Sequence, residues 1–139
     1  MTIPSEYQRA SIEFERFMVD ARDISGLATT NMAYNMVVGV LITFRHRLPV
    51  RDAIRFAGVL PPMLRALFVA DWDVDQPVLP FGDRSAMTRE MKSLRAAHNF
   101  SPDSAIHDVA AALRRHVDEA SLDALLATLP EGAVDYWRS

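Results

Sequence analysis

The chain has 139 residues, of which 50% are hydrophobic and 24% are charged, and its formal net charge at pH 7 is −3. A disordered chain is excluded because this composition suits one globular domain with a single core. The net negative charge argues against nucleic acid as the main partner, since phosphate binding requires a basic surface. With no cysteine in the sequence, disulfides and thiolate metal sites are excluded as well.

The hydropathy pattern predicts no membrane span. The N-terminus, residues 1–9, is polar and lacks the apolar segment of a secretory signal. The longest apolar stretch, residues 32–44, falls short of the roughly 20 residues that a membrane-spanning helix needs. We therefore expect a cytoplasmic location.

The predicted first half, about residues 5–70, begins with a helix whose start is marked by a capping box of Ser5 and Gln8. Gly26 ends this helix, because glycine readily adopts the left-handed conformation that follows a helix. A second helix runs from a cap at Thr29 or Thr30 to about residue 47. It is apolar on nearly all sides, which predicts a central position in the fold.

Glycine and proline mark two further features of the first half. Gly39, inside the second helix, lets another backbone approach closely. Pro49 begins a third helix, and Pro61-Pro62 interrupts it and begins a short fourth helix that reaches about residue 70. The residues expected to face inward on the third helix are Ala53, Phe56, Ala57 and Leu60.

Residues 71–82 are predicted to form the crossover between the halves. Prolines in this segment stop helix formation. Four large apolar side chains predict that the segment is pinned to the body rather than flexible. These side chains are Trp72, Val78, Leu79 and Phe81.

The second half, about residues 83–139, repeats the pattern of helix starts and stops. Its first helix is predicted to end at Asn99, since asparagine is the next-best residue to glycine in a left-handed stop. Serine, proline and aspartate at positions 101–103 are a strong signal for a helix start. The predicted helix starts are Asp83 or Ser85, Ser101, Asp118 and Pro130.

Two Leu-Pro steps, at 60–61 and 129–130, lie 69 positions apart and lead with identical spacing to the pairs 67–68 and 136–137. When residues 37–68 are aligned on 106–137, only four pairs are identical, so the argument for a repeat rests on the order of stops, caps and proline steps. We predict an all-α single domain over residues 1–139, a bundle of six to eight helices made of two pseudo-duplicated halves. The halves are expected to pack through the helices at 32–44 and 104–117.

One set of mostly apolar residues, with both Leu-Pro steps, forms a recognisable pattern: Ala33, Val37, Val40-Leu41, Phe44, Arg47-Leu48-Pro49, Leu60-Pro61, Leu67-Phe68, Trp72, Ala105, Val109, Leu113 and Leu129-Pro130. Over roughly residues 14–137, the chain with this pattern resembles the bacterial domain-of-unknown-function family 2267. The resemblance implies an all-helical bacterial protein with two similar halves and no assigned activity, and it supplies no catalytic residue to carry over.

Candidate chemistry is weak throughout the chain. Aspartates at 71, 73 and 75 copy the opening of a calcium-binding loop, but Gln76 and Gly82 stand where that loop needs glycine and glutamate. No two histidines have metal-ligand spacing, and there is no nucleophile elbow or phosphate-binding glycine loop. We therefore predict no catalytic residue, no metal site and no cofactor. The four histidines, His46, His98, His107 and His116, are interpreted as structural or surface residues.

One basic concentration stands out, and Arg47, Arg51 and Arg55 are its candidate interaction surface. It could bind an anionic ligand, an acidic protein surface or a phospholipid head group. The alternative is a solvated helix face that pairs with Asp52 and nearby carboxylates.

Three functional hypotheses follow. The first is a non-catalytic protein-interaction module with a protein partner or a homodimer, because no polar constellation points to chemistry. The second is a small-ligand-binding protein for an apolar or anionic ligand, because methionines are adaptable pocket walls. The third is an enzyme of unknown class, which would need an acid–base pair in a cleft.

Overall fold

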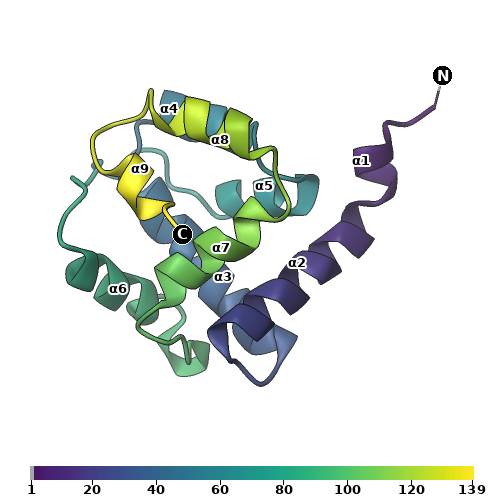
Figure 1. Cartoon of the computed structure of the whole chain (residues 1–139). Helices are drawn as coiled ribbons and strands as arrows, with labels where there is room; N and C mark the ends of the chain where they lie inside the picture. Colours follow the sequence, from purple (N-terminus) through teal and green to yellow (C-terminus); the bar gives the residue numbers. More distant parts are fainter. Residues whose placement is uncertain (1) are drawn as a thin grey trace.

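The computed structural model describes residues 2–139, and every regular element in that range is helical (Figure 1). The predicted all-α fold is confirmed. The described residues form nine α-helices and one 3-10 helix, more than the six to eight predicted. The elements are α1 (Ser5–Gln8), α2 (Ala10–Ser25), α3 (Thr30–Arg45), α4 (Val50–Ala57), α5 (Pro62–Val69), α6 (Arg84–Ser93), η1 (Ala96–His98), α7 (Ala105–Arg114), α8 (Glu119–Leu126) and α9 (Ala133–Tyr136).

The extra helix arises because the predicted first helix is broken at Arg9, whose backbone (φ −105°, ψ 9°) is not helical. The predicted capping box is wrong, since Pro4 occupies the N-cap position and Ser5 already lies in the first turn. Helix α1 and the start of α2 project from the body as an arm (Figure 1). Gly26 ends α2 in the left-handed conformation, as predicted.

Helix α3 is the centre of the fold, and it contacts α2, α5, α6 and α7. Its predicted cap is confirmed, because Thr29 Oγ1 accepts a hydrogen bond from the Met32 amide at 3.1 Å. Most of its residues after the first turn are buried. Gly39 faces α6, where an added Cβ would lie 2.9 Å from the Met91 carbonyl oxygen. The close backbone approach expected at this glycine is therefore present.

Two predictions in the second half are wrong. Arg95 adopts the left-handed conformation (φ 55°), whereas Asn99 is extended. Asn99 acts through its side chain instead, because its Nδ2 donates to the carbonyls of Met91 and Leu94 at 2.9 and 3.1 Å. The Ser101 hydroxyl donates to the Asn99 side chain, and α7 begins at residue 105 rather than directly after Ser101.

The crossover is pinned at two of the four side chains that were expected to hold it. The Arg45 guanidinium lies 5.3 Å from the centre of the Trp72 ring, and Phe81 packs against the Phe44 ring. Val78 and Leu79 are exposed, although the Leu79 amide donates to the His46 carbonyl at 2.9 Å. Between residues 73 and 77 the segment forms an exposed loop.

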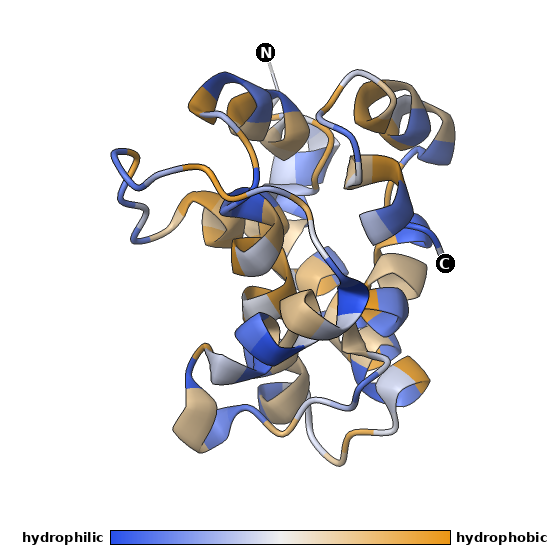
Figure 2. Cartoon of the chain, turned by 90° about the vertical axis from the view of Figure 1, so that its left-hand side faces the viewer, coloured by the Kyte–Doolittle hydropathy of each residue, from blue (hydrophilic) through white to orange (hydrophobic). Residues whose placement is uncertain are grey.

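One continuous core runs through both halves, and most of the surrounding helices show both hydrophilic and hydrophobic residues (Figure 2). Phe44, Phe56 and Trp137 form its aromatic centre, with ring centroids 4.7–5.5 Å apart. The four predicted inward residues of α4 and its C-terminal turn are all buried. No single helix of residues 2–139 is long and apolar enough to cross a membrane.

The halves do not pack as two separate bundles. Helices α3 and α7 are in contact, as expected, but α6 packs on α3 of the first half. Helix α2 packs on α3 and, more extensively, on α7 of the second half. Helix α2 therefore covers α7 of the second half, and α6 covers α3 of the first half.

Candidate functional site

A groove of about 300 Å³ lies between the projecting arm and the turn that joins α4 to α5, and we call it the arm groove. Its floor is apolar and its rim carries ionisable side chains. The apolar lining includes Phe14, Phe17, Val59, Leu60, Met63, Leu64 and Val117. The ionisable lining is Glu6, Glu13, Arg65, His116 and Asp118.

The Leu-Pro step builds one wall of the arm groove. Leu60 is buried, and Pro61 precedes α5 as its N-cap residue while Pro62 opens the helix. Arg65, one turn into α5, reaches back and donates from Nε to the Ala57 carbonyl and from Nη2 to the Leu60 carbonyl. These bonds satisfy carbonyl groups at the end of α4. The guanidinium of Arg65 is thus engaged within the wall.

A carboxylate on α2 fixes His116, which is one of the residues that line the arm groove. Asp20 Oδ2 lies 2.6 Å from His116 Nε2, and Asp20 Oδ1 lies 3.7 Å from Arg115 Nη1. The Phe17 ring meets the His116 ring edge-on, with centroids 5.7 Å apart. This contact, which we call the Asp20 clamp, fixes the C-terminal end of α7 against α2.

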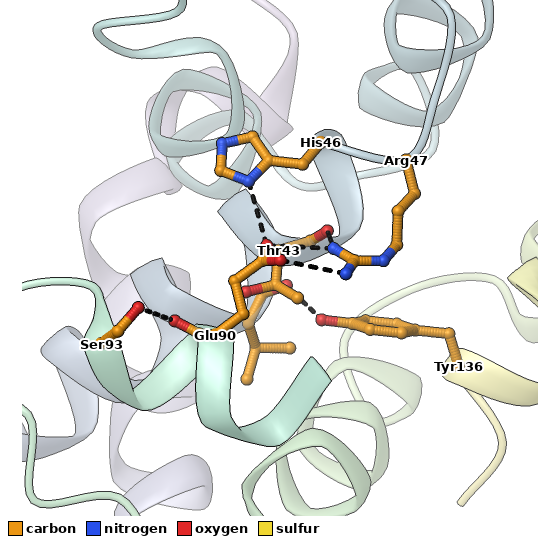
Figure 3. Close-up of polar contacts among 7 residues, drawn as sticks. Thr43, His46, Arg47, Glu90, Ser93 and Tyr136 are labelled. Carbon is orange, nitrogen blue, oxygen red and sulfur yellow. Dashed lines mark hydrogen bonds and ion pairs between the residues drawn. The ribbon is translucent and has the colours of Figure 1, made fainter. Parts of the chain in front are cut away.

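A second clamp joins α6 to the end of α3 (Figure 3). Glu90 accepts two hydrogen bonds from Arg47, both at 3.0 Å, and its Oε2 also lies 3.0 Å from His46 Nδ1. Arg47 Nη1 donates to the Thr43 carbonyl at 2.8 Å as well. We call this cluster the Glu90 clamp. Its carboxylate has few oxygen sites left for a ligand.

Electrostatics in the Glu90 clamp favour the ionised carboxylate. Burial raises the pKa of Glu90, but the hydrogen bonds and charges of Arg47 and His46 outweigh it, so the pKa is lower than usual. Nearby, the Tyr136 hydroxyl donates to the Val40 carbonyl at 2.6 Å, and burial raises its pKa. Neither group is poised for proton transfer near neutral pH, so the cluster stabilises structure.

The structure does not bring Arg47, Arg51 and Arg55 together. Arg47 is 7% exposed and belongs to the Glu90 clamp. Arg51 and Arg55 lie on the outward side of α4, where Arg55 bonds Asp52 at 3.3 Å and the Thr128 hydroxyl at 2.8 Å.

The outward side of α4 is apolar as well as basic. Val50 is 38% exposed and Ile54 is 60% exposed. They share one side of the helix with Arg51 and Arg55, since residues four apart lie on the same face. We call these four residues the α4 face.

The other candidates stay apart. Asp73 Oδ1 accepts the Asp75 amide at 3.0 Å, so this loop carboxylate turns to its own backbone. His107 is exposed beside Asp108, and His98 ends the exposed 3-10 helix. Within residues 2–139, no group of three or more His, Asp and Glu side chains could hold a metal ion.

Sequence reasoning missed the arm groove and both clamps. The Leu-Pro step was a usable signal, because it marks a fixed turn that forms a wall. The clamps had no local signal, since Arg47 and Glu90 are 43 positions apart and Asp20 and His116 are 96 apart.

A second depression, of about 720 Å³, is wider and more open. Arg47, Pro49, residues 78–82 and residues 130–132 border it. Its turn, at 130–132, lies 69 positions after residues 61–63 of the arm groove. Its border at 47 and 49 lies 69 positions before residues 116 and 118 of the arm groove.

A family model described as "Uncharacterized conserved protein (DUF2267)" matches residues 14–136. No curated protein matches the chain. The matched range includes the two clamps, the α4 face and the turns at 61–63 and 130–132 that border the two depressions. Helix α1 precedes the matched range.

Proposed function

The chain belongs to the family of uncharacterised conserved proteins DUF2267, and we propose that it is a non-catalytic protein-interaction module whose docking site is the arm groove. The groove itself carries the proposal, since it combines an apolar floor with a charged rim. Apolar surface rimmed by polar groups is typical of protein docking sites. A cytoplasmic location in a bacterial cell stays a prediction, which cell fractionation would test.

The state of the nearby ionisable groups supports docking rather than catalysis. Arg65 bonds carbonyl groups of its own wall, and His116 is held by Asp20. Glu13 accepts hydrogen bonds from Arg9 and Arg16. General acid–base catalysis needs a group that is free to reach substrate, and these three are engaged with the protein. The two remaining ionisable groups of the lining, Glu6 and Asp118, are exposed carboxylates with no base or acid partner placed beside them in this lining.

A photo-crosslinking residue in place of Met63 tests this proposal in living cells. Met63 lines the groove and is 38% exposed, whereas Val69, on the same helix and 41% exposed, does not line it and is the matched control. We expect a discrete crosslinked species from position 63 and only diffuse background from position 69. The same pattern from both positions would remove the groove as the docking site.

A small apolar ligand is a second candidate occupant, because a volume of about 300 Å³ reaches the lower end of small-molecule sites. Met63 would form an adaptable wall for it. Native mass spectrometry of protein from its own cell would then detect a co-purified mass that Met63→Trp loses. Equal spectra for both proteins would eliminate this candidate.

We also propose that the halves descend from one duplicated unit. Arg45 donates to the Phe68 carbonyl and Arg114 donates to the Trp137 carbonyl, each at 2.9 Å and over 23 positions. Buried residues in the two halves also lie 69 positions apart, which is the same offset that relates the residues lining the two depressions. The buried pairs include Val37/Ile106, Val40/Val109, Phe44/Leu113, Ala53/Leu122, Leu60/Leu129, Leu64/Ala133 and Phe68/Trp137.

An experimental structure tests the duplication directly. We expect the backbones of residues 37–68 and 106–137 to superpose with the helices and the arginine–carbonyl bonds in register. A crystal structure in which the two arginines bind unrelated carbonyls would contradict a common origin.

A further inference from the structure

We propose that the occupant of the arm groove is the α4 face of a second copy of this chain, so that two copies form a closed two-fold dimer. The proposal rests on the function proposed above for the groove and names its partner. Three observations carry it: the chemistry of the α4 face, the chemistry of the groove rim, and the position of one beside the other.

The α4 face combines apolar contact area with the positive charges of Arg51 and Arg55. Val50 and Ile54 expose 38% and 60% of their surface. Within the described part of the chain, no carboxylate lies within ion-pair distance of Arg51, and Arg55 meets the partly exposed Asp52. The face therefore offers a short apolar strip beside two guanidinium groups.

The rim of the arm groove carries the opposite charge. Glu6 and Asp118 line it, and neither forms an ion pair within residues 2–139. The Arg65 guanidinium keeps its positive charge while it binds the carbonyls of Ala57 and Leu60, but the three carboxylates of the lining, Glu6, Glu13 and Asp118, outnumber it. An apolar groove with two carboxylates outside any ion pair of residues 2–139 matches an apolar strip with two arginines, and such complementarity selects partners.

The face and the groove adjoin each other. Helix α4 ends at Ala57, and Gly58, the next residue, already lines the groove. When two complementary patches lie side by side, a two-fold axis between them places each patch against its complement on the other copy. Such a contact closes after two copies, whereas an unclosed contact would continue into a filament.

A charge-swap experiment by analytical ultracentrifugation tests the dimer. The face variant carries Arg51→Glu and Arg55→Glu, and the groove variant carries Glu6→Arg and Asp118→Arg. We expect wild type to sediment as a dimer, and each variant alone to have a dissociation constant at least about tenfold higher. Circular dichroism confirms that each variant is folded.

Mixing the two variants restores complementary charge in both contacts of a heterodimer, so we expect a dimer from the mixture. Arg89→Glu with Arg138→Glu is the matched control for the face variant, because it makes the same charge change at exposed positions outside the face and the groove. The control is expected to dimerise like wild type. A monomeric wild type, larger assemblies, or a mixture that stays monomeric would overturn the proposal.

Crosslinking separates this proposal from the docking function. With the photo-crosslinking residue at Met63 and a mixture of isotopically labelled and unlabelled protein, we expect crosslinks between copies to residues 50–57. If position 63 instead crosslinks a different protein while the purified chain is monomeric, the groove remains a docking site and the second copy is excluded as its occupant.

Discussion

At the scale of single residues, Glu90 on α6 joins through its carboxylate two side chains that follow α3. Its carboxylate receives Arg47 through two bonds and lies against His46, and its carbonyl accepts the Ser93 hydroxyl at 2.6 Å (Figure 3). Arg47 is nearly buried, so without this carboxylate its charge would lack a partner. A buried charge left unpaired is costly.

We expect Glu90→Gln to lower the free energy of unfolding by about 2 kcal/mol, because it removes the partner of a nearly buried guanidinium. Urea denaturation measures the change. Asp23→Asn is the control, since the Arg22–Asp23 pair is more exposed and contributes less than about 0.5 kcal/mol. Equal losses in the two variants would show that the Glu90 clamp is no stronger than a surface pair.

The lowered pKa of Glu90 also predicts a dependence on pH. An unfolded glutamate titrates near about pH 4.3, and in the folded protein the pKa is lower. The clamp's stabilisation is therefore fully present above about pH 4.3 and is lost as the pH falls through the folded pKa. Urea midpoints should fall more steeply on acidification for wild type than for Glu90→Gln, and parallel curves would contradict the assignment.

Sequence reasoning at this scale succeeded where a residue acts on its own neighbours. Thr29 and Gly26 were predicted correctly, because a cap and a helix stop depend on the adjacent backbone. Arg47 was wrongly predicted to lie on an interaction surface, because its partner Glu90 lies 43 positions away and gives no local signal. Asn99 was assigned the wrong conformation, because its side chain bonds carbonyls of a preceding helix.

At the scale of elements, the α3–α6 contact depends on the missing side chain of Gly39. The Met91 carbonyl and side chain and the Asn99 amide all lie within 3.2 Å of where its Cβ would be. The close approach lets α6 lie directly on the central helix. Helix propensity alone would favour alanine here by about 1 kcal/mol.

We expect Gly39→Ala to destabilise the protein by about 1 kcal/mol or more, because the clash with backbone outweighs the gain in propensity. Thermal unfolding measures the shift. Gly58→Ala is the control: its backbone is right-handed and its nearest neighbour is an oxygen of its own preceding turn at 3.2 Å, so a smaller change is expected. A stabilised Gly39→Ala would mean that α6 moves away at little cost.

At the scale of the whole molecule, the core is shared between the halves. Helix α2 of the first half lies against α7, helix α6 of the second half lies against α3, and a clamp fixes each contact. The sequence predicted the helical class and most buried positions, since periodicity and proline steps are local. It did not predict that α2 packs on α7 and α6 on α3, because two separate bundles would bury the same apolar helix faces.

We expect neither residues 1–75 nor residues 76–139 to fold alone, because the first piece lacks α6, which covers α3, and the second lacks α2, which covers α7. Co-expressed, the two pieces should form a stable complex, since the break falls in the exposed loop of the crossover. Circular dichroism and co-purification measure this outcome. Cooperative unfolding of either piece alone would show that the halves are independent bundles.

The two clamps also constrain how related sequences diverge. Asp20 belongs to one half and His116 to the other, and the same holds for Glu90 and Arg47. A substitution in one half thus leaves a partly buried polar side chain of the other half without its partner, until a second substitution compensates. Among natural relatives, positions 20 and 116 should vary together, and so should positions 47 and 90, so that the two halves do not change independently at these sites.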